Sequence, residues 1–207
     1  MTIEEDKKTI EYFRSNIFES KSAYNAWKMI AYAKAIPVVG NDLAERYTKI
    51  QNYHPAFFVI AERSFLITWV ILICHAFDKD NRAYSLKKID QTIYSQFLLE
   101  ESNTGIIDQL KIARDKLFAH RDKEIDPKLI TIPGIDKMDG FWDRLKKFYN
   151  QLSNKVEGSA TAFDFTEDVK HETEHLFMNL ERGRNVELKE IDIKWQWKEN
   201  NNKISKD

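Results

Sequence analysis

The amino-acid sequence predicts an all-α protein: an antiparallel helix bundle with extra helices and a short extended arm near the C-terminus. Apolar residues recur at helical spacing through most of the 207 residues, and the prolines and glycines fall between these segments or at their ends. Hydrophobic residues make up 43% of the chain, with 13 Phe, 8 Tyr and 5 Trp, which is enough to build a core. We expect a helical domain over residues 1–185, followed by an arm and polar tail over 186–207.

Eight segments carry the helical pattern. They are Ile3–Ser15, Ser22–Ala35, Asp42–Asn52, Pro55–Phe77, Leu86–Phe97, Thr104–His120, Phe141–Val156 and Phe165–Arg182. Pro55 suits a first helical turn, and Asn41 and Ser85 suit N-caps. Asp164 and Glu167 have the spacing of a capping box at the start of the last helix.

Two stretches depart from the helical pattern. Val186–Trp197 alternates apolar and polar residues nearly in period two, which predicts a short strand or an extended arm before the polar tail Lys198–Asp207. The stretch Asp122–Asp139 contains Pro127, Pro133 and Gly134 and is followed by Gly140, which predicts a flexible loop.

Composition and charge narrow the functional classes. Lys and Arg nearly balance Asp and Glu, giving a net charge of -1, so a uniformly basic surface for nucleic acid is excluded. Cys74, the single cysteine, cannot form an intrachain disulfide and lies in an apolar run, which favours a reducing compartment. That run, Ser64–Phe77, is shorter than the ~20 residues of a membrane span. Since no signal peptide is recognisable either, we expect a cytoplasmic protein without a membrane partner.

The helix that ends near His120 holds the strongest functional candidates. Its apolar stripe consists of Ile106, Leu110, Ala113 and Leu117. Arg114 and His120 lie on opposite sides of this stripe, about 120° apart on a straight helix. A shared site would therefore need the helix to bend or end before His120, or a second protomer to supply the missing partner.

Arginine and histidine suit the chemistry of phosphodiesters. A guanidinium matches phosphate oxygens and their developing charge, and an imidazole, whose usual pKa is about 6.5, exchanges protons near neutral pH. RNA supplies its own nucleophile in the 2′-hydroxyl. The alternative is that Arg114 and His120 are boundary residues satisfied by neighbouring carboxylates or carbonyls.

The string from Ala113 to Asp122 resembles the signature of the HEPN superfamily, in particular its abortive-infection U-type branch: Arg114, the polar Asp115, a short spacer and His120. The resemblance implies a helical bundle that pairs as a homodimer, with two copies of the Arg and His in a cleft between protomers. Many such proteins are metal-independent endoribonucleases that act in phage defence or as toxins, and others are noncatalytic.

The resemblance gives roles to three residues: Arg114 for phosphate and transition-state charge, Asp115 as its polar partner, and His120 as general acid and base. It implies no cofactor and no metal, with RNA as substrate and an antitoxin or defence protein as a further partner. A toxin subset has a tyrosine two positions after the histidine, where this chain has Asp122, so regulation by tyrosine modification is not implied. Among the basic residues around the motif, we predict RNA contacts for Lys111, Lys116 and Arg121. The competing hypothesis is a noncatalytic module of the same fold that binds a protein or nucleic acid.

The string His171-Glu172-Thr173-Glu174-His175 has the spacing of a zinc-protease motif. On a helical wheel both histidines face away from the apolar stripe, their flanks are charged, and no third ligand is evident downstream. A solvated helix face is the favoured interpretation, and a zinc hydrolase ranks third among the functional hypotheses.

Overall fold

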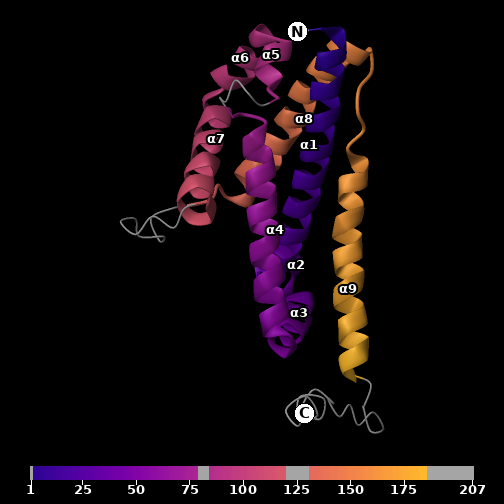
Figure 1. The fold of residues 1–207 in the computed structure, drawn as a ribbon. Coiled ribbons are helices and arrows are strands. Elements are labelled where there is room, and N and C mark those ends of the chain that lie inside the picture. The colour runs from indigo at the N-terminus through magenta and orange to yellow at the C-terminus, as the bar shows by residue number, and fades with distance from the viewer. Residues whose placement is uncertain (1, 79–83, 120–130, 186–207) are drawn as a thin grey trace, which may run out of the picture.

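The computed structural model describes residues 2–78, 84–119 and 131–185, and this part of the chain is helical without any strand (Figure 1). The α-helices are α1 (Ile3–Ala31), α2 (Ile36–Val39), α3 (Asn41–Tyr53), α4 (Pro55–His75), α5 (Leu86–Ile89), α6 (Gln91–Leu99), α7 (Glu101–Ala113), α8 (Ile135–Glu157) and α9 (Asp168–Asn185). A π-helical segment (Arg114–Ala119) follows α7, and a 3₁₀ turn (Asp164–Glu167) precedes α9. The predicted all-α fold is confirmed, while the predicted arm and tail over 186–207 lie outside the described residues.

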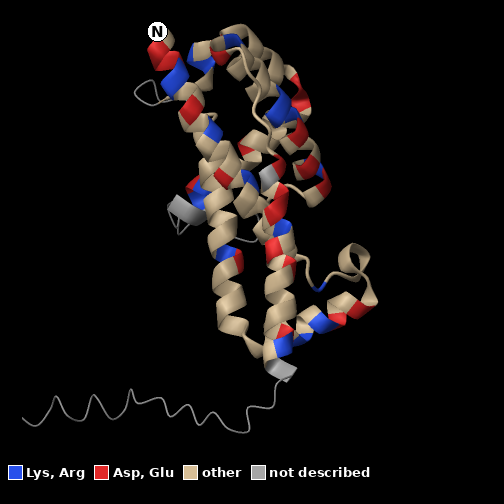
Figure 2. Cartoon of the chain, turned by 90° about the vertical axis from the view of Figure 1, so that its right-hand side faces the viewer, with Lys and Arg blue, Asp and Glu red and all other residues tan. Residues whose placement is uncertain are grey.

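The long helices alternate in direction, as in an antiparallel bundle (Figure 1). Helix α1 is central and packs against α4, α8 and α9. The short α2 and α3 lie at one end of the bundle, and α5 and α6 lie at the other. Lys and Arg are interspersed with Asp and Glu along the helices, as the balanced composition predicts (Figure 2).

Helix α1 is continuous where the sequence predicted two helices, Ile3–Ser15 and Ser22–Ala35. Of the polar residues between them, Asn16, Ser20 and Lys21 are buried on the core side of one helix, and Glu19 is exposed. Ser20 is fully buried, and its hydroxyl donates a 2.8 Å hydrogen bond to the carbonyl of Trp69 on α4. Since that bond satisfies the hydroxyl inside the bundle, the serine does not need a loop.

Aromatic residues hold the three central helices together. The ring of Tyr24 on α1 lies 5.5 Å from Trp69 on α4 and 5.7 Å from Trp142 on α8, measured between centroids. All three side chains are almost completely buried. Burial of such large rings contributes strongly to folding, and edge-on contacts add to it.

Other helix limits differ from the sequence prediction for local reasons. The segment Leu86–Phe97 divides at Asp90, whose carboxylate accepts hydrogen bonds from the amides of Thr92 and Ile93 and so begins α6. Helix α8 begins at Ile135, inside the predicted loop Asp122–Asp139, because Met138 is buried in the core. Its Gly140 lies within the helix, so this glycine does not mark an end. Gly40, rather than Asn41, is the N-cap of α3 and has a φ of 80°, a region that glycine enters without strain.

Helix α4 is longer than the apolar run Ser64–Phe77 suggested. With 21 residues and a mean hydropathy of 2.0 over its most apolar 18-residue window, it is long and apolar enough to cross a membrane by length and composition alone. The core helix of a soluble protein passes the same test. In the bundle α4 packs along α1, which buries Trp69, Val70 and Ile73, but only 28% of that window is buried, so much of its apolar surface stays uncovered.

Candidate functional site

The helix that carries the predicted motif changes its geometry at Arg114. Helix α7 ends at Ala113, and the chain continues as a π-helical segment through Ala119. A π turn places one more residue between hydrogen-bonded groups than an α turn does, and such turns are frequent at functional sites. The straight helix assumed for the 120° separation of Arg114 and His120 therefore ends at the first of these residues.

Two carboxylates hold the guanidinium of Arg114. Its Nη1 donates to Asp78 Oδ1 at 2.6 Å, and its Nε donates to Asp115 Oδ1 at 2.7 Å. The Arg114 side chain is 20% exposed. Burial by itself lowers the pKa of Arg114, but the hydrogen bonds to Asp115 and Asp78 outweigh it and raise the pKa. The site thus presents a fixed, permanently charged donor group at the surface between α4 and α7.

Asp78 is a site residue that the sequence analysis missed. It lies 36 positions before Arg114, just past the end of α4, and no spacing rule links the two. The available signal is that Asp78 is the first charged residue after the apolar run, because a carboxylate at the end of a core helix needs a partner.

Cys74 lies beneath this site and is almost fully buried. Burial raises the pKa of the Cys74 thiol to about 12. The protonated thiol is a poor nucleophile, so Cys74 is a small apolar core residue, as the sequence indicated.

The described part of the motif gathers Arg114, Asp115 and Lys111 at the C-terminal end of α4. Lys111 Nζ donates a 2.6 Å hydrogen bond to the carbonyl of Phe77, which attaches α7 to the end of α4. Lys116 is half-buried within the π-helical segment. His120 and Arg121 lie outside the described residues, so their predicted roles, and the RNA contacts of all three basic residues, stay predictions.

An apolar stripe on α4 leads to the same site. Ile60 is 66% exposed, and Ile67 and Ile71 are half-buried. The three residues share one face of α4 at helical spacing, and this face ends near Asp78. The Arg114 site is therefore continuous with apolar surface that the single chain leaves partly uncovered.

The predicted zinc-protease string lies on the outside of α9. His171 and His175 are both exposed, and His171 Nδ1 lies 3.6 Å from Glu174 Oε2. Within the described ranges no group of three or more His, Cys, Asp or Glu residues is placed to hold a metal ion. The arrangement matches the solvated helix face that the sequence favoured.

Comparison with protein families gives one match, to the HEPN family described as AbiU2, over residues 6–176. The match runs from the first turns of α1 into α9 and includes the Arg114 site. Comparisons with curated proteins and with solved structures found no match.

Proposed function

Because the chain belongs to the AbiU2 family of HEPN domains, a family of abortive infection, we propose that it is a metal-independent endoribonuclease of phage defence or of a toxin–antitoxin system. In this proposal two chains pair, and Arg114 and His120 from both protomers line a cleft that binds RNA. The protein acts in the cytoplasm, with an antitoxin or defence protein as a further partner.

The observation that carries the proposal is the fixed guanidinium of Arg114 at the start of the π-helical segment. Two carboxylates orient it, so little conformational entropy is lost when a phosphate approaches. The guanidinium stabilises negative charge on the phosphate in the transition state. His120 takes the proton of the 2′-hydroxyl and returns one to the leaving 5′-oxygen.

The apolar stripe of α4 supports the pairing of two chains. Ile60, Ile67 and Ile71 present apolar surface next to the Arg114 site, and exposed apolar patches mark interaction surfaces. Two chains related by a two-fold axis along this face would bring their Arg114 residues toward each other. Pairing also gives Arg114 and His120 a second route to a shared site, besides the change of helix geometry at Arg114.

One observation favours the competing hypothesis of a noncatalytic binding module. Within a single chain both carboxylates that contact Arg114 neutralise its charge, and a structural ion pair needs no substrate. An enzyme must release part of this pairing to a phosphate, whereas a scaffold keeps it.

The test is cleavage of end-labelled RNA in EDTA by the wild type, Arg114→Ala and His120→Ala, with analysis of the product ends. We expect 2′,3′-cyclic phosphate ends from the wild type alone. Arg46→Ala is the matched control, since it removes a guanidinium that pairs with Glu181 on α9, away from the site. If well-folded wild-type protein cleaves none of a varied set of RNAs, the binding module becomes the better explanation.

Pairing is tested separately by sedimentation of the wild type and Ile71→Glu. We expect a dimer for the wild type and a monomer for the variant, because a buried carboxylate disfavours an apolar interface. Leu99→Glu, at a residue 82% exposed on α6, is the control and should remain dimeric. A monomeric wild type would contradict the shared cleft.

A further inference from the structure

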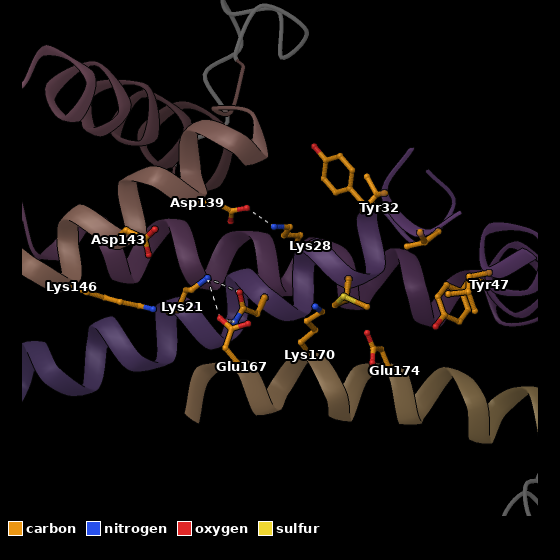
Figure 3. A pocket seen from close by; sticks show the side chains of 15 residues that line it. Lys21, Lys28, Tyr32, Tyr47, Asp139, Asp143, Lys146, Glu167, Lys170 and Glu174 are labelled. Atoms are coloured by element: carbon orange, nitrogen blue, oxygen red, sulfur yellow. Dashed lines mark hydrogen bonds and ion pairs between the residues drawn. The ribbon is translucent and has the colours of Figure 1, made fainter. Parts of the chain in front are cut away.

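A polar cavity lies between α1, α8 and α9, with α2 and α3 at one end (Figure 3). Its volume is about 560 Å³, within the range of small-molecule sites, roughly 300–1,000 Å³. None of the residues of the Arg114 site lines it. The cavity is therefore a separate feature that the proposed ribonuclease activity does not use.

Ammonium groups gather at one end of the cavity. Figure 3 shows Lys146 extending from α8 toward Lys21 on α1. Lys28 lies two turns further along α1, and Lys170 rises from α9 beside Glu174. Lys28 is paired with Asp139 at 2.5 Å. Lys146 and Lys170 form no hydrogen bond or ion pair with any other described residue. Lys146 thus remains for an incoming anion at this end, whereas Lys170 lies beside Glu174 (Figure 3).

Lys21 is the most deeply placed of these cations, since only 9% of its side chain is exposed. Its Nζ donates to Asn25 Oδ1 at 2.8 Å, lies 3.9 Å from Glu167 Oε1, and sits 5.0 Å from the centroid of the Tyr24 ring. The pKa of Lys21 is lowered to about 8, chiefly by burial; the carboxylates of Glu167 and Asp139 oppose this shift, and the ammonium groups of Lys146 and Lys28 add to it. An anion placed among these groups would relieve that repulsion.

The carboxylates on this side are already engaged. Asp139 accepts from the hydroxyl of Tyr24 at 2.9 Å as well as from Lys28. Glu167 lies near Lys21 and within 3.5 Å of the amide nitrogen of Asn25. Asp143 is exposed at the rim and remains solvated. The engaged carboxylates orient the lysines without occupying all of their donor groups.

The other end of the cavity is apolar and aromatic. Tyr32 is half-buried and its ring packs edge-on against Trp27, with 5.9 Å between the centroids, so a face of the Tyr32 ring is held in place. Met29 and Val39 complete an apolar wall. Glu174 lies between this end and the lysines, beside Tyr47 (Figure 3). Its carboxylate can accept hydrogen bonds from the amino group of a nucleobase.

From the different chemistry of the two ends we propose that the cavity binds a nucleoside monophosphate, with its phosphate beside Lys21 and Lys146 and its base against Tyr32. A tyrosine face stacks on a base, and ammonium groups are general phosphate ligands. An inorganic anion would use only the cationic end, and an apolar ligand only the other. The nucleotide satisfies both ends, and none of the residues of the Arg114 site lines this cavity.

The experiment is isothermal titration of the full chain with AMP, GMP, CMP and UMP, with the matching nucleosides and inorganic phosphate as separate arms. We expect at least one monophosphate to bind roughly tenfold or more tightly than its nucleoside and than phosphate, because both ends contribute. Lys146→Gln should weaken that binding roughly tenfold. Lys147→Gln is the matched control: it removes the same charge from the next residue of α8, which is exposed and does not line the cavity. Its affinity should equal that of the wild type.

Three results would overturn the proposal: no binding of any of the four monophosphates, equal affinities of Lys146→Gln and the wild type, or equal losses in Lys146→Gln and Lys147→Gln. Tyr32→Ala is a second test variant, since it should weaken monophosphate binding while leaving the weak binding of inorganic phosphate unchanged. Arg114→Ala should bind the monophosphate as the wild type does. A protein without ribonuclease activity can therefore still pass this test, and a ribonuclease can fail it.

Discussion

The Arg114 site and the cavity lined by Lys21, the Lys21 cavity, are built in opposite ways. The Arg114 site lies at the edge of the bundle, where one guanidinium meets two carboxylates beside a partly uncovered apolar stripe. The Lys21 cavity is lined by α1, α2, α3, α8 and α9 of a single chain. The first arrangement is suited to completion by a second protomer and a polymeric substrate, whereas the second already has the depth that a small ligand needs. Substitutions that affect one site and spare the other test this difference.

The largest effect is expected at Arg114. Arg114→Lys keeps the charge but loses the planar fork that contacts Asp78, Asp115 and a phosphate at once. We expect RNA cleavage to fall by roughly 10²-fold or more, close to the loss in Arg114→Ala. Cleavage rates under single-turnover conditions check this, and activity of Arg114→Lys near that of the wild type would show that the charge alone suffices.

The next effect is on stability and concerns Lys21. Because burial lowers its pKa from 10.5 to about 8, the unfolded chain binds more protons than the folded chain between these values, so stability rises with pH across that window. Below pH 8 the folded protein bears the full cost of the buried charge. We expect Lys21→Met to be more stable than the wild type by about 2 kcal/mol at pH 7, with the gap closing as the pH approaches 10.5.

Urea unfolding of both proteins from pH 7 to pH 10 measures the gap in the free energy of unfolding. A gap that stays constant with pH would contradict the depressed pKa of Lys21. RNA cleavage should be the same in both proteins at pH 7, since the cavity shares no residue with the Arg114 site.

A smaller effect is expected at Asp78, which acts as a positioning residue through Arg114. Asp78→Asn replaces the ion pair with a neutral contact of the same shape, so the guanidinium is held less firmly. We expect kcat for RNA cleavage to fall about tenfold with KM nearly unchanged, and Asp78→Glu to restore part of the loss. If only the melting temperature moves, Asp78 has a structural role.

The smallest effect is a control on the fold itself. Asp90→Ala removes the N-cap of α6 and the contact of Asp90 with Lys155, both away from the two sites. We expect a loss of about 1 kcal/mol in the free energy of unfolding, measured with urea, and unchanged cleavage and nucleotide binding. A change in either activity would mean that the two sites depend on overall stability.

Periodicity predicted the helices because each one buries a continuous apolar face, but it misplaced several of their limits. Ser20 and Gly140 lay outside the predicted helices, and both lie inside long helices because tertiary contacts satisfy or bury their surroundings. Asp90 shows the reverse case, in which one carboxylate begins a new helix within a predicted one. Whether such a residue continues, ends or begins a helix depends on residues from distant parts of the sequence that pack against it.

The sequence identified Arg114 and Asp115 through a local motif, whereas Asp78 lies 36 residues from Arg114 and only the packing of α4 on α7 brings them together. The Lys21 cavity was missed for the same reason. Its lysines lie on α1, α8 and α9, and the pattern of α1 alone marks Lys21 as an ordinary polar residue.

The π-helical segment also makes this region sensitive to length. A π turn contains one residue more than the α turn it replaces, so deleting one residue between Arg114 and Ala119 would allow the α7 geometry to continue. The residues inside the segment would then take new positions around the helix axis relative to Arg114. Insertions and deletions in these six residues would therefore change which groups can face the guanidinium, even where every named side chain is kept.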